Sequence, residues 1–215
     1  MKAIIFDFDG TLANTLPICF EAFQDVFRKY DQRDVTSEDI VAMFGPSEPD
    51  IIRKNLLHEN KEEAIEHFYF VYKENHHQLV KPNEEISDLL QMVKDRGMKL
   101  AIVTGKARRS LDLSLEELKM NVSFDVIITG DDVEKPKPDP EGILKVLSQL
   151  GIDHTEAMFI GDSDADIGAG LGAGVLTVGV QWLPEFQTAE FSRKPDAMYT
   201  SIGEFKKTLI AMEVR

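Results

Sequence analysis

Short apolar runs alternate with longer amphipathic stretches along the chain, and this alternation predicts its secondary structure. Most of the runs show little polar alternation, which is typical of strands that helices cover on both faces. Apolar residues at helical spacing lie between them, for example over 86–93 and over 143–150, where Gly151 ends the pattern. The pattern predicts an α/β fold, a doubly wound parallel sheet that binds ligands at the carboxyl ends of its strands. The expected strands cover residues 3–8, 98–104, 124–129, 157–160, 175–180 and, less clearly, 197–200.

The interval between the first two expected strands is much longer than one crossover helix requires. Such a connection takes about a dozen residues, whereas this one runs from Leu12 to Met98. Apolar residues at helical spacing over 18–30 and 65–79, with a short helix expected over 49–57, indicate that the excess is not loop. A helical insertion at this point would lie over the end of the first strand. We therefore predict a core segment over 1–14, an inserted small α-helical cap domain over 15–81 and the rest of the core over 82–215.

Composition fits a globular protein and limits the partners that it can bind. Of 215 residues, 43% are hydrophobic and 29% are charged, which is ordinary for such a protein. The net charge of -14 argues against a nucleic acid or an anionic membrane, because both attract basic surfaces. An anionic substrate would need a locally positive site, which a metal ion, a few lysines and helix N-termini can supply. Cys19 has no partner for an internal disulfide, and the sequence shows neither a signal segment nor an apolar run of membrane-spanning length, so we expect a cytoplasmic protein.

Two carboxylates, Asp7 and Asp9, follow the first expected strand. Residues two apart in an extended segment point to the same side, so these carboxylates could converge on one spot. Like charges that are close repel each other, and a bound cation or a shared proton relieves the repulsion. Gly10 permits a sharp turn, and the hydroxyl of Thr11 is free to donate a hydrogen bond to a substrate. The alternative is a strand that ends in an ordinary Asx turn.

Hydroxyl and amide groups also follow the second expected strand, at Thr104, Gly105 and Lys106. A phosphate oxygen could accept hydrogen bonds from the Thr104 hydroxyl and from the amides of the next two residues. A helix is expected to begin at Ala107, so the alternative is that Thr104 caps that helix.

Two further segments add charge at strand ends. Prolines hold Lys135 and Lys137 in a stiff segment before a helix, where either lysine could meet a phosphate or could be a solvated charge in a surface turn. Asp162 follows the fourth expected strand and could give a third oxygen to a cation, since Mg²⁺ prefers oxygen ligands. Asp166, one turn further on, could steady a lysine or a ligating water. Helix capping by Asp162 or Ser163 is the alternative at this segment.

In these segments the chain resembles the haloacid dehalogenase-like hydrolase superfamily, in particular its small phosphatases close to phosphoglycolate phosphatase. The resemblance covers almost the whole length, and the run from Asp7 to Leu12, DFDGTL, is its most specific part. It implies a Rossmann-like core with a helical cap. It also implies that Asp7 is a nucleophile that becomes an aspartyl phosphate, and that Asp9 is the general acid and base.

The same resemblance assigns the remaining groups. Thr104 corresponds to the hydroxyl that binds phosphate, and Asp162 corresponds to a Mg²⁺ ligand beside the Asp7 carboxylate and the Asp9 backbone carbonyl. The interval to Asp162 favours Lys137 over Lys135 as the phosphate-site lysine. The family often has an acid where this chain has Asn14, so any role of that acid is absent here.

The function that these features predict is a Mg²⁺-dependent phosphatase acting through an aspartyl phosphate on a small phosphomonoester resembling phosphoglycolate. The partner would then be a small phosphorylated metabolite, and the protein a monomer or homodimer. An inorganic pyrophosphatase or a sugar-phosphate mutase on the same core is an alternative. A phospho-acceptor signalling domain is an alternative of another class, although the helical insert and the position of Asp7 in the first strand count against it.

Four other features carry weaker expectations. The loop at 44–47, with Arg53 nearby, could lie over the site or could be a plain turn between helices. His76 is expected at a solvated helix end, because adjacent histidines face apart on a helix. Trp182 follows a strand end and could border the site, but we expect it to pack on the surface. The glycine-rich stretch 168–174 is interpreted as a helix packed closely on the sheet.

Overall fold

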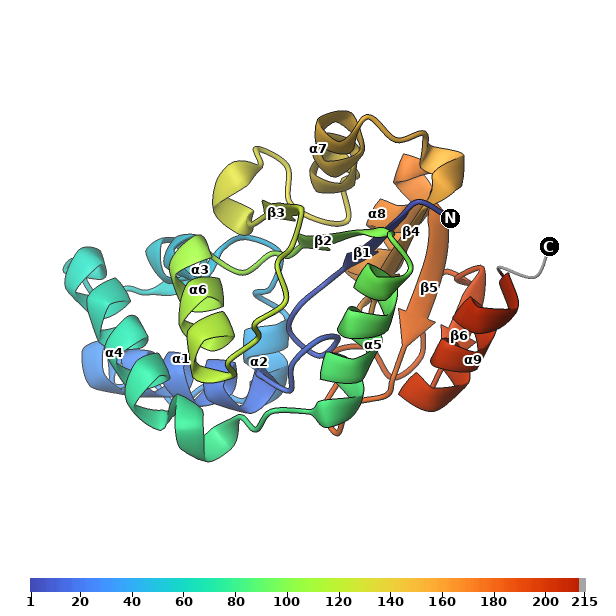
Figure 1. Cartoon of the computed structure of the whole chain (residues 1–215). Helices are drawn as coiled ribbons and strands as arrows, with labels where there is room; N and C mark the ends of the chain where they lie inside the picture. Colours follow the sequence, from blue (N-terminus) through green and yellow to red (C-terminus); the bar gives the residue numbers. More distant parts are fainter. Residues whose placement is uncertain (213–215) are drawn as a thin grey trace.

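The computed structural model describes residues 1–212, in which six parallel strands form one sheet with helices on both faces (Figure 1). The strand order is β3-β2-β1-β4-β5-β6, which confirms the predicted doubly wound sheet. Phe6 pairs with Ile102 on one side and Ile160 on the other, so the segments that follow these three strands leave the sheet at one edge. The strands are β1 (Ala3–Phe6), β2 (Lys99–Val103), β3 (Val126–Ile128), β4 (Ala157–Gly161), β5 (Leu176–Val180) and β6 (Ala197–Tyr199).

Alternate residues of the central strand β1 face two separate parts of the core. Ile4 and Phe6 pack in the cluster that includes residues of α5 and α9, whereas Ala3 and Ile5 pack with residues of α7 and α8. Both faces of β1 are therefore buried, which explains its unbroken apolar run. These core helices are α5 (Glu84–Asp95), α6 (Arg108–Glu117), α7 (Glu141–Leu150), α8 (Asp164–Ala173) and α9 (Ile202–Met212), with two 3-10 turns, η1 (Gly130–Asp132) and η2 (His154–Glu156).

Five helices lie between β1 and β2, and the first four, α1 to α4, gather at one side of the sheet (Figure 1). The two longest pack against each other, with the rings of Phe23 and Phe68 only 4.7 Å apart between centroids. The interval before β2 is thus helical, as the apolar spacing predicts. The four helices are α1 (Leu16–Asp31), α2 (Ser37–Val41), α3 (Glu48–Asn55) and α4 (Lys61–Leu79).

Helix α8 approaches its neighbours closely because of its glycines. A Cβ on Gly168 would lie 2.7 Å from Pro138, and one on Gly170 would lie 2.5 Å from Thr177 of β5. The left-handed Gly174 ends the helix, at φ 72°. The predicted close packing is therefore confirmed, both on the sheet and on the segment that carries Lys137.

Trp182 packs against α9, with its ring centroid 5.5 Å from that of Phe205, which confirms the expected packing role. Its indole Nε1 also donates to the backbone oxygen of Thr11 at 2.8 Å, which ties the loop after β5 to the loop after β1. Across residues 1–212, no helix combines the length and the apolar character needed to cross a membrane.

Candidate active site

Three buried carboxylates meet where β1 and β4 end. Asp7 follows β1, Asp162 follows β4, and Asp166 lies in the first turn of α8. Each is at most 2% exposed, and one oxygen of each lies within 4.8 Å of the others. The Asp7 amide donates to the backbone oxygen of Ile160 at 2.8 Å, so strand pairing continues to the site and fixes this residue. The strand order reverses between β1 and β4, the place where such sheets bind ligands.

The turn after β1 positions Asp162. The Thr11 hydroxyl donates to Asp162 Oδ1 at 3.0 Å, and the Gln187 amide donates to Oδ2 at 2.7 Å. Gly10 has a φ of 77°, and a Cβ on it would overlap the Asp162 carboxylate, so this turn requires glycine. Ser163, rather than Asp162, caps α8. Thr11 thus supports the carboxylate of Asp162, whereas we expected its hydroxyl to meet substrate.

The structure places Lys137, and not Lys135, beside the carboxylates. Lys137 Nζ lies 2.9 Å from Asp7 Oδ1 and 2.5 Å from Asp166 Oδ1. Lys135 is exposed, and its backbone amide donates to Glu141 at 2.8 Å. Asp166 therefore steadies the lysine, as its position one turn into α8 predicts.

Burial disfavours the charged forms of Asp7 and Asp162. Loss of hydration raises the pKa of Asp7 to about 7, the charge of Asp166 adds to the rise, and Lys137 opposes it. Burial, followed by the charges of Asp166 and Asp7, also raises the pKa of Asp162 well above its usual range. Burial disfavours the charge of Lys137, but Asp166 and Asp7 outweigh it and hold the pKa of this lysine above its ordinary value.

A divalent cation fits these groups. Asp7 Oδ1 is buried and, within residues 1–212, receives no hydrogen bond, although Lys137 lies near it. A cation on Asp7 and Asp162 would give that oxygen a ligand in addition to Lys137 and would offset the burial and the repulsion that raise both pKa values. The carboxylate oxygens are of the kind that Mg²⁺ prefers.

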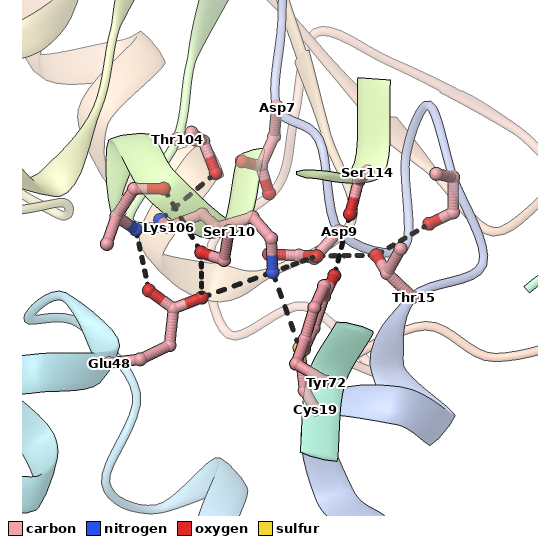
Figure 2. Close-up of polar contacts among 12 residues, drawn as sticks. Asp7, Asp9, Thr15, Cys19, Glu48, Tyr72, Thr104, Lys106, Ser110 and Ser114 are labelled. Carbon is pink, nitrogen blue, oxygen red and sulfur yellow. Dashed lines mark hydrogen bonds and ion pairs between the residues drawn. The ribbon is translucent and has the colours of Figure 1, made fainter. Parts of the chain in front are cut away.

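Asp9 lies outside the three-carboxylate cluster. Its Oδ1 accepts a hydrogen bond from the Thr15 hydroxyl at 2.5 Å and lies 3.2 Å from Lys106 Nζ (Figure 2). The Asp7 and Asp9 side chains therefore converge on one cavity, which both of them line, but they do not meet in one carboxylate cluster. Asp9 is displaced because β1 ends at Phe6 and the chain then turns, with three later amides donating to the Phe8 oxygen, so the alternation of a strand no longer applies.

Lys106 is enclosed by groups from both the sheet and the inserted helices. Its ammonium lies 3.2 Å from Glu48 Oε1 and 3.6 Å from the sulfur of Cys19, and it lies over the Tyr72 ring at 4.6 Å from the centroid (Figure 2). None of its side-chain surface is exposed. Burial disfavours its charge, but the neighbouring acids, Asp9 foremost, hold its pKa well above the ordinary value.

Glu48, at the start of α3, joins that helix to the beginning of α6. It accepts hydrogen bonds from the Ala107 amide and the Ser110 hydroxyl, both at 2.6 Å, in addition to its contact with Lys106. We expected the backbone amide of Lys106 to face a phosphate, but that amide donates to Thr104 Oγ1 at 3.2 Å. Sequence reasoning placed Lys106 at the site but missed Glu48 and its pairing with the Lys106 side chain, because an acid in a first helical turn is common and signals no distant partner.

A cavity of about 220 Å³ lies between the strand ends and the inserted helices. Thr104 lines it and does not cap α6, whose preceding residue is Ala107. The loop at 44–47 also reaches it, so this loop lies over the site. A Cβ on Gly105 would lie 3.2 Å from the Gly45 oxygen, which shows how closely the loop meets the sheet. The lining includes Asp7, Asp9, Phe23, Phe44, Glu48, Gly105, Lys106, Lys137, Asp164 and Thr188.

Two expectations for the inserted helices differ from the structure. Arg53 is half exposed and pairs with Glu62 at 2.9 Å, and it is not among the residues that line the cavity. His76 is buried, not solvated, and its Nε2 lies 3.1 Å from the Ser114 hydroxyl oxygen. Helix α6 packs on α4 and covers this histidine, a contact that helical periodicity does not reveal.

Comparison with known proteins agrees with this geometry. The model of the haloacid dehalogenase-like hydrolase family matches residues 4–180. Pyrophosphatase PpaX from Bacillus cereus (strain AH820) is 34% identical over 213 residues, which cover 99% of this chain and 98% of that protein. The structure of a predicted phosphoglycolate phosphatase from Haemophilus somnus has a TM-score of 0.84 at 22% identity, covering 97% of this chain and 98% of that one. CbbY from Rhodobacter sphaeroides in complex with phosphate has a TM-score of 0.81 at 24% identity, covering 95% and 96% of the two chains.

The two solved structures show the likeness of fold, and the family model spans the ends of β1, β2 and β4 and the loop after β3, which together carry the site. The match to the family model over residues 4–180, together with the 34% identity to PpaX, shows that the chain belongs to the haloacid dehalogenase-like hydrolases.

Proposed function

We propose that this protein is a Mg²⁺-dependent phosphatase that hydrolyses a small phosphomonoester by way of an aspartyl phosphate on Asp7. The observation that carries this proposal is the Asp7 carboxylate itself. It is buried at a cavity, one oxygen receives no hydrogen bond within residues 1–212, and an ammonium lies 2.9 Å from that oxygen. A carboxylate attacks phosphorus without first losing a proton to a base, once its own charge is stabilised.

The other residues take roles that suit their positions. Lys137 and Thr104 would hold the oxygens of the phosphoryl group that Asp7 receives. Asp9, on the side of the inserted helices, would give a proton to the leaving oxygen and later take one from the attacking water. Mg²⁺ held by the carboxylates of Asp7 and Asp162 and the Asp9 backbone carbonyl would supply positive charge against the transferring group.

The inserted helices would act as a cap. Residues 15–81 carry the loop at 44–47 and Glu48, which close one side of the cavity. Covering the site in this way would exclude bulk water from the phosphoryl group and strengthen the electrostatic contacts around it. The division into core and cap, and a cytoplasmic location, remain predictions.

Pyrophosphate hydrolysis is the second candidate, because the 34% identity to a pyrophosphatase extends over nearly the whole chain. Phosphoglycolate is the third substrate to consider, since the motifs resemble those of phosphoglycolate phosphatase. The same phosphoryl site would serve all of these substrates, so the part of the cavity that holds the leaving group must distinguish them.

Phosphate release from phosphoglycolate, pyrophosphate, sugar phosphates and nucleotides, with and without Mg²⁺, tests the proposal. We expect release that depends on Mg²⁺, and a loss of about 10³-fold or more in kcat for Asp7→Asn, because the amide is a poor nucleophile. Asp34→Asn is the matched control, because Asp34 is an exposed aspartate paired only with Arg28 in the described residues. Full activity in Asp7→Asn would refute the proposal, and conversion of a sugar phosphate without phosphate release would identify a mutase.

A further inference from the structure

We propose that the site selects phosphomonoesters with an uncharged, largely apolar leaving group, and that Glu48 enforces this choice by neutralising Lys106. The inference rests on the proposed phosphatase function and names the class of substrate. It separates simple alkyl or aryl phosphates from phosphoglycolate, whose leaving group carries a carboxylate, and from pyrophosphate, whose leaving group is itself a phosphate.

The cavity has two chemically different ends. Asp7, Thr104 and Lys137 lie at the strand ends, where the phosphoryl group would be held. The inserted helices contribute mainly apolar lining, from Phe23, Val41, Phe44 and Ile51. A leaving group that points away from the strand ends would therefore lie against hydrocarbon, which favours apolar surface and penalises an unpaired charge.

No cation of the lining is free to pair with an anionic leaving group. Among the described residues around the cavity, the two cations are Lys106 and Lys137. Lys137 is held between Asp7 and Asp166, at 2.9 and 2.5 Å. Lys106 has no exposed side-chain surface and lies 3.2 Å from both of its acidic partners. A second anion would have to displace a carboxylate from one of these lysines.

The acidic residues that line the cavity also disfavour a leaving group that carries a negative charge. Asp7, Asp9, Glu48 and Asp164 all line the cavity, against two lysines. A divalent cation at the strand ends would balance this excess, but the dianionic phosphoryl group would then restore it. A leaving group with its own negative charge would meet a net negative field in a site of low polarity, where repulsion between charges is strong.

Glu48 is held firmly enough to keep Lys106 neutralised. It accepts from the Ala107 amide and the Ser110 hydroxyl, both at 2.6 Å, and Figure 2 shows its carboxylate bonded to both Ser110 and the Lys106 ammonium. Swinging away would take an acceptor from three buried donors, although the Ser110 hydroxyl also donates to the Ala107 oxygen and Lys106 also pairs with Asp9. Without its charge, Lys106 would face Asp9 alone and the cavity would become less negative by one unit.

The test compares substrates that differ only in the charge of the leaving group. Carbamoylmethyl phosphate is the neutral counterpart of phosphoglycolate, with an amide in place of the carboxylate. For the wild-type enzyme with Mg²⁺, we expect kcat/KM to be at least about tenfold higher for the neutral ester, which corresponds to about 1.4 kcal/mol. In Glu48→Gln we expect this ratio to fall by about fivefold or more, because the amide no longer cancels the Lys106 charge.

The ratio of two substrates measured on one preparation does not depend on how much of the variant is folded, so a loss of stability in Glu48→Gln does not obscure the result. Glu38→Gln is the matched control, since Glu38 is an exposed acid on α2, and it should keep the wild-type ratio. A wild-type preference for phosphoglycolate over its amide, or for pyrophosphate over both, would overturn the proposal. An unchanged ratio in Glu48→Gln would overturn the role of Glu48. Absence of phosphate release from every ester would instead count against the phosphatase function.

Discussion

The two ends of the cavity are built in different ways. At the phosphoryl end, Asp7 and Asp162 follow the paired strands β1 and β4, and Lys137 is held beside them by Asp7 and Asp166. At the other end, Lys106 comes from the sheet, but Glu48 comes from α3 in the inserted helices. The first end would persist if those helices moved, whereas the second exists only while α3 lies against α6. Chemistry and selection of substrate can therefore vary separately in this fold.

Replacing each lysine by methionine gives the largest expected contrast between the two ends. Lys137→Met should lower kcat/KM by about 10³-fold, because it removes a positive donor from the transferring group. Lys106→Met should lower it by about 10-fold to 100-fold, because this lysine acts through the position of Asp9. Steady-state phosphate release from one neutral ester measures both. Equal losses of kcat/KM in the two variants would show that Lys137 and Lys106 do not have the separate roles proposed for them.

Truncating Glu48 tests whether the second end also stabilises the fold. In Glu48→Ala, the Lys106 ammonium, the Ala107 amide and the Ser110 hydroxyl lose a buried acceptor. We expect the free energy of unfolding to fall by about 3 kcal/mol, measured by urea denaturation. Glu48→Gln keeps an acceptor oxygen and should lose less. A loss in Glu48→Ala below about 0.5 kcal/mol, as for a surface residue, would contradict this account.

The smallest expected effect concerns pH and His76, which lies between α4 and α6. Burial, followed by the charge of Lys106, lowers the pKa of His76 to about 4 from its ordinary value of 6.5. The unfolded chain therefore binds a proton that the folded chain does not. The stability from neutral His76 is fully present above about pH 6.5 and is lost as the pH falls toward about 4, so that about 2 kcal/mol is lost by pH 5.

Urea denaturation above about pH 7 and near pH 5 measures this effect. His76→Gln should lose less stability than the wild type between these conditions, whereas His77→Gln, at an exposed neighbouring position, should behave as the wild type does. Identical losses in His76→Gln and the wild type would show that this histidine does not link the inserted helices to the pH dependence.

The sequence predicts the phosphoryl end well because its residues follow strand ends. A parallel sheet brings those ends to one edge, so Asp7, Thr104 and Asp162 could be placed together from their positions along the chain alone. The choice of Lys137 over Lys135 needed the resemblance to a known family, since both lysines occupy the same proline-rich segment. The catalytic roles of these residues remain predictions.

The end of the cavity that Glu48 and Lys106 form could not be predicted from the sequence. Glu48 and Lys106 are 58 positions apart, and their contact depends on how an inserted helix packs on a loop of the sheet. His76 is buried for the same reason. Helix α2 has only five residues, too few for a periodic pattern. Helix α9 differs from α2, because its buried residues Ile202, Phe205 and Leu209 repeat at helical spacing. This helix could therefore have been predicted from the sequence.

The contact between Glu48 and Lys106 also affects how the protein would behave if α3 left the sheet. Separation would expose a carboxylate and an ammonium, both of which water hydrates strongly. Most inter-helix contacts would instead uncover hydrocarbon, which promotes self-association. This charged contact would therefore make the separated surfaces easier to hydrate, and less prone to self-association, than a contact between hydrocarbon side chains alone.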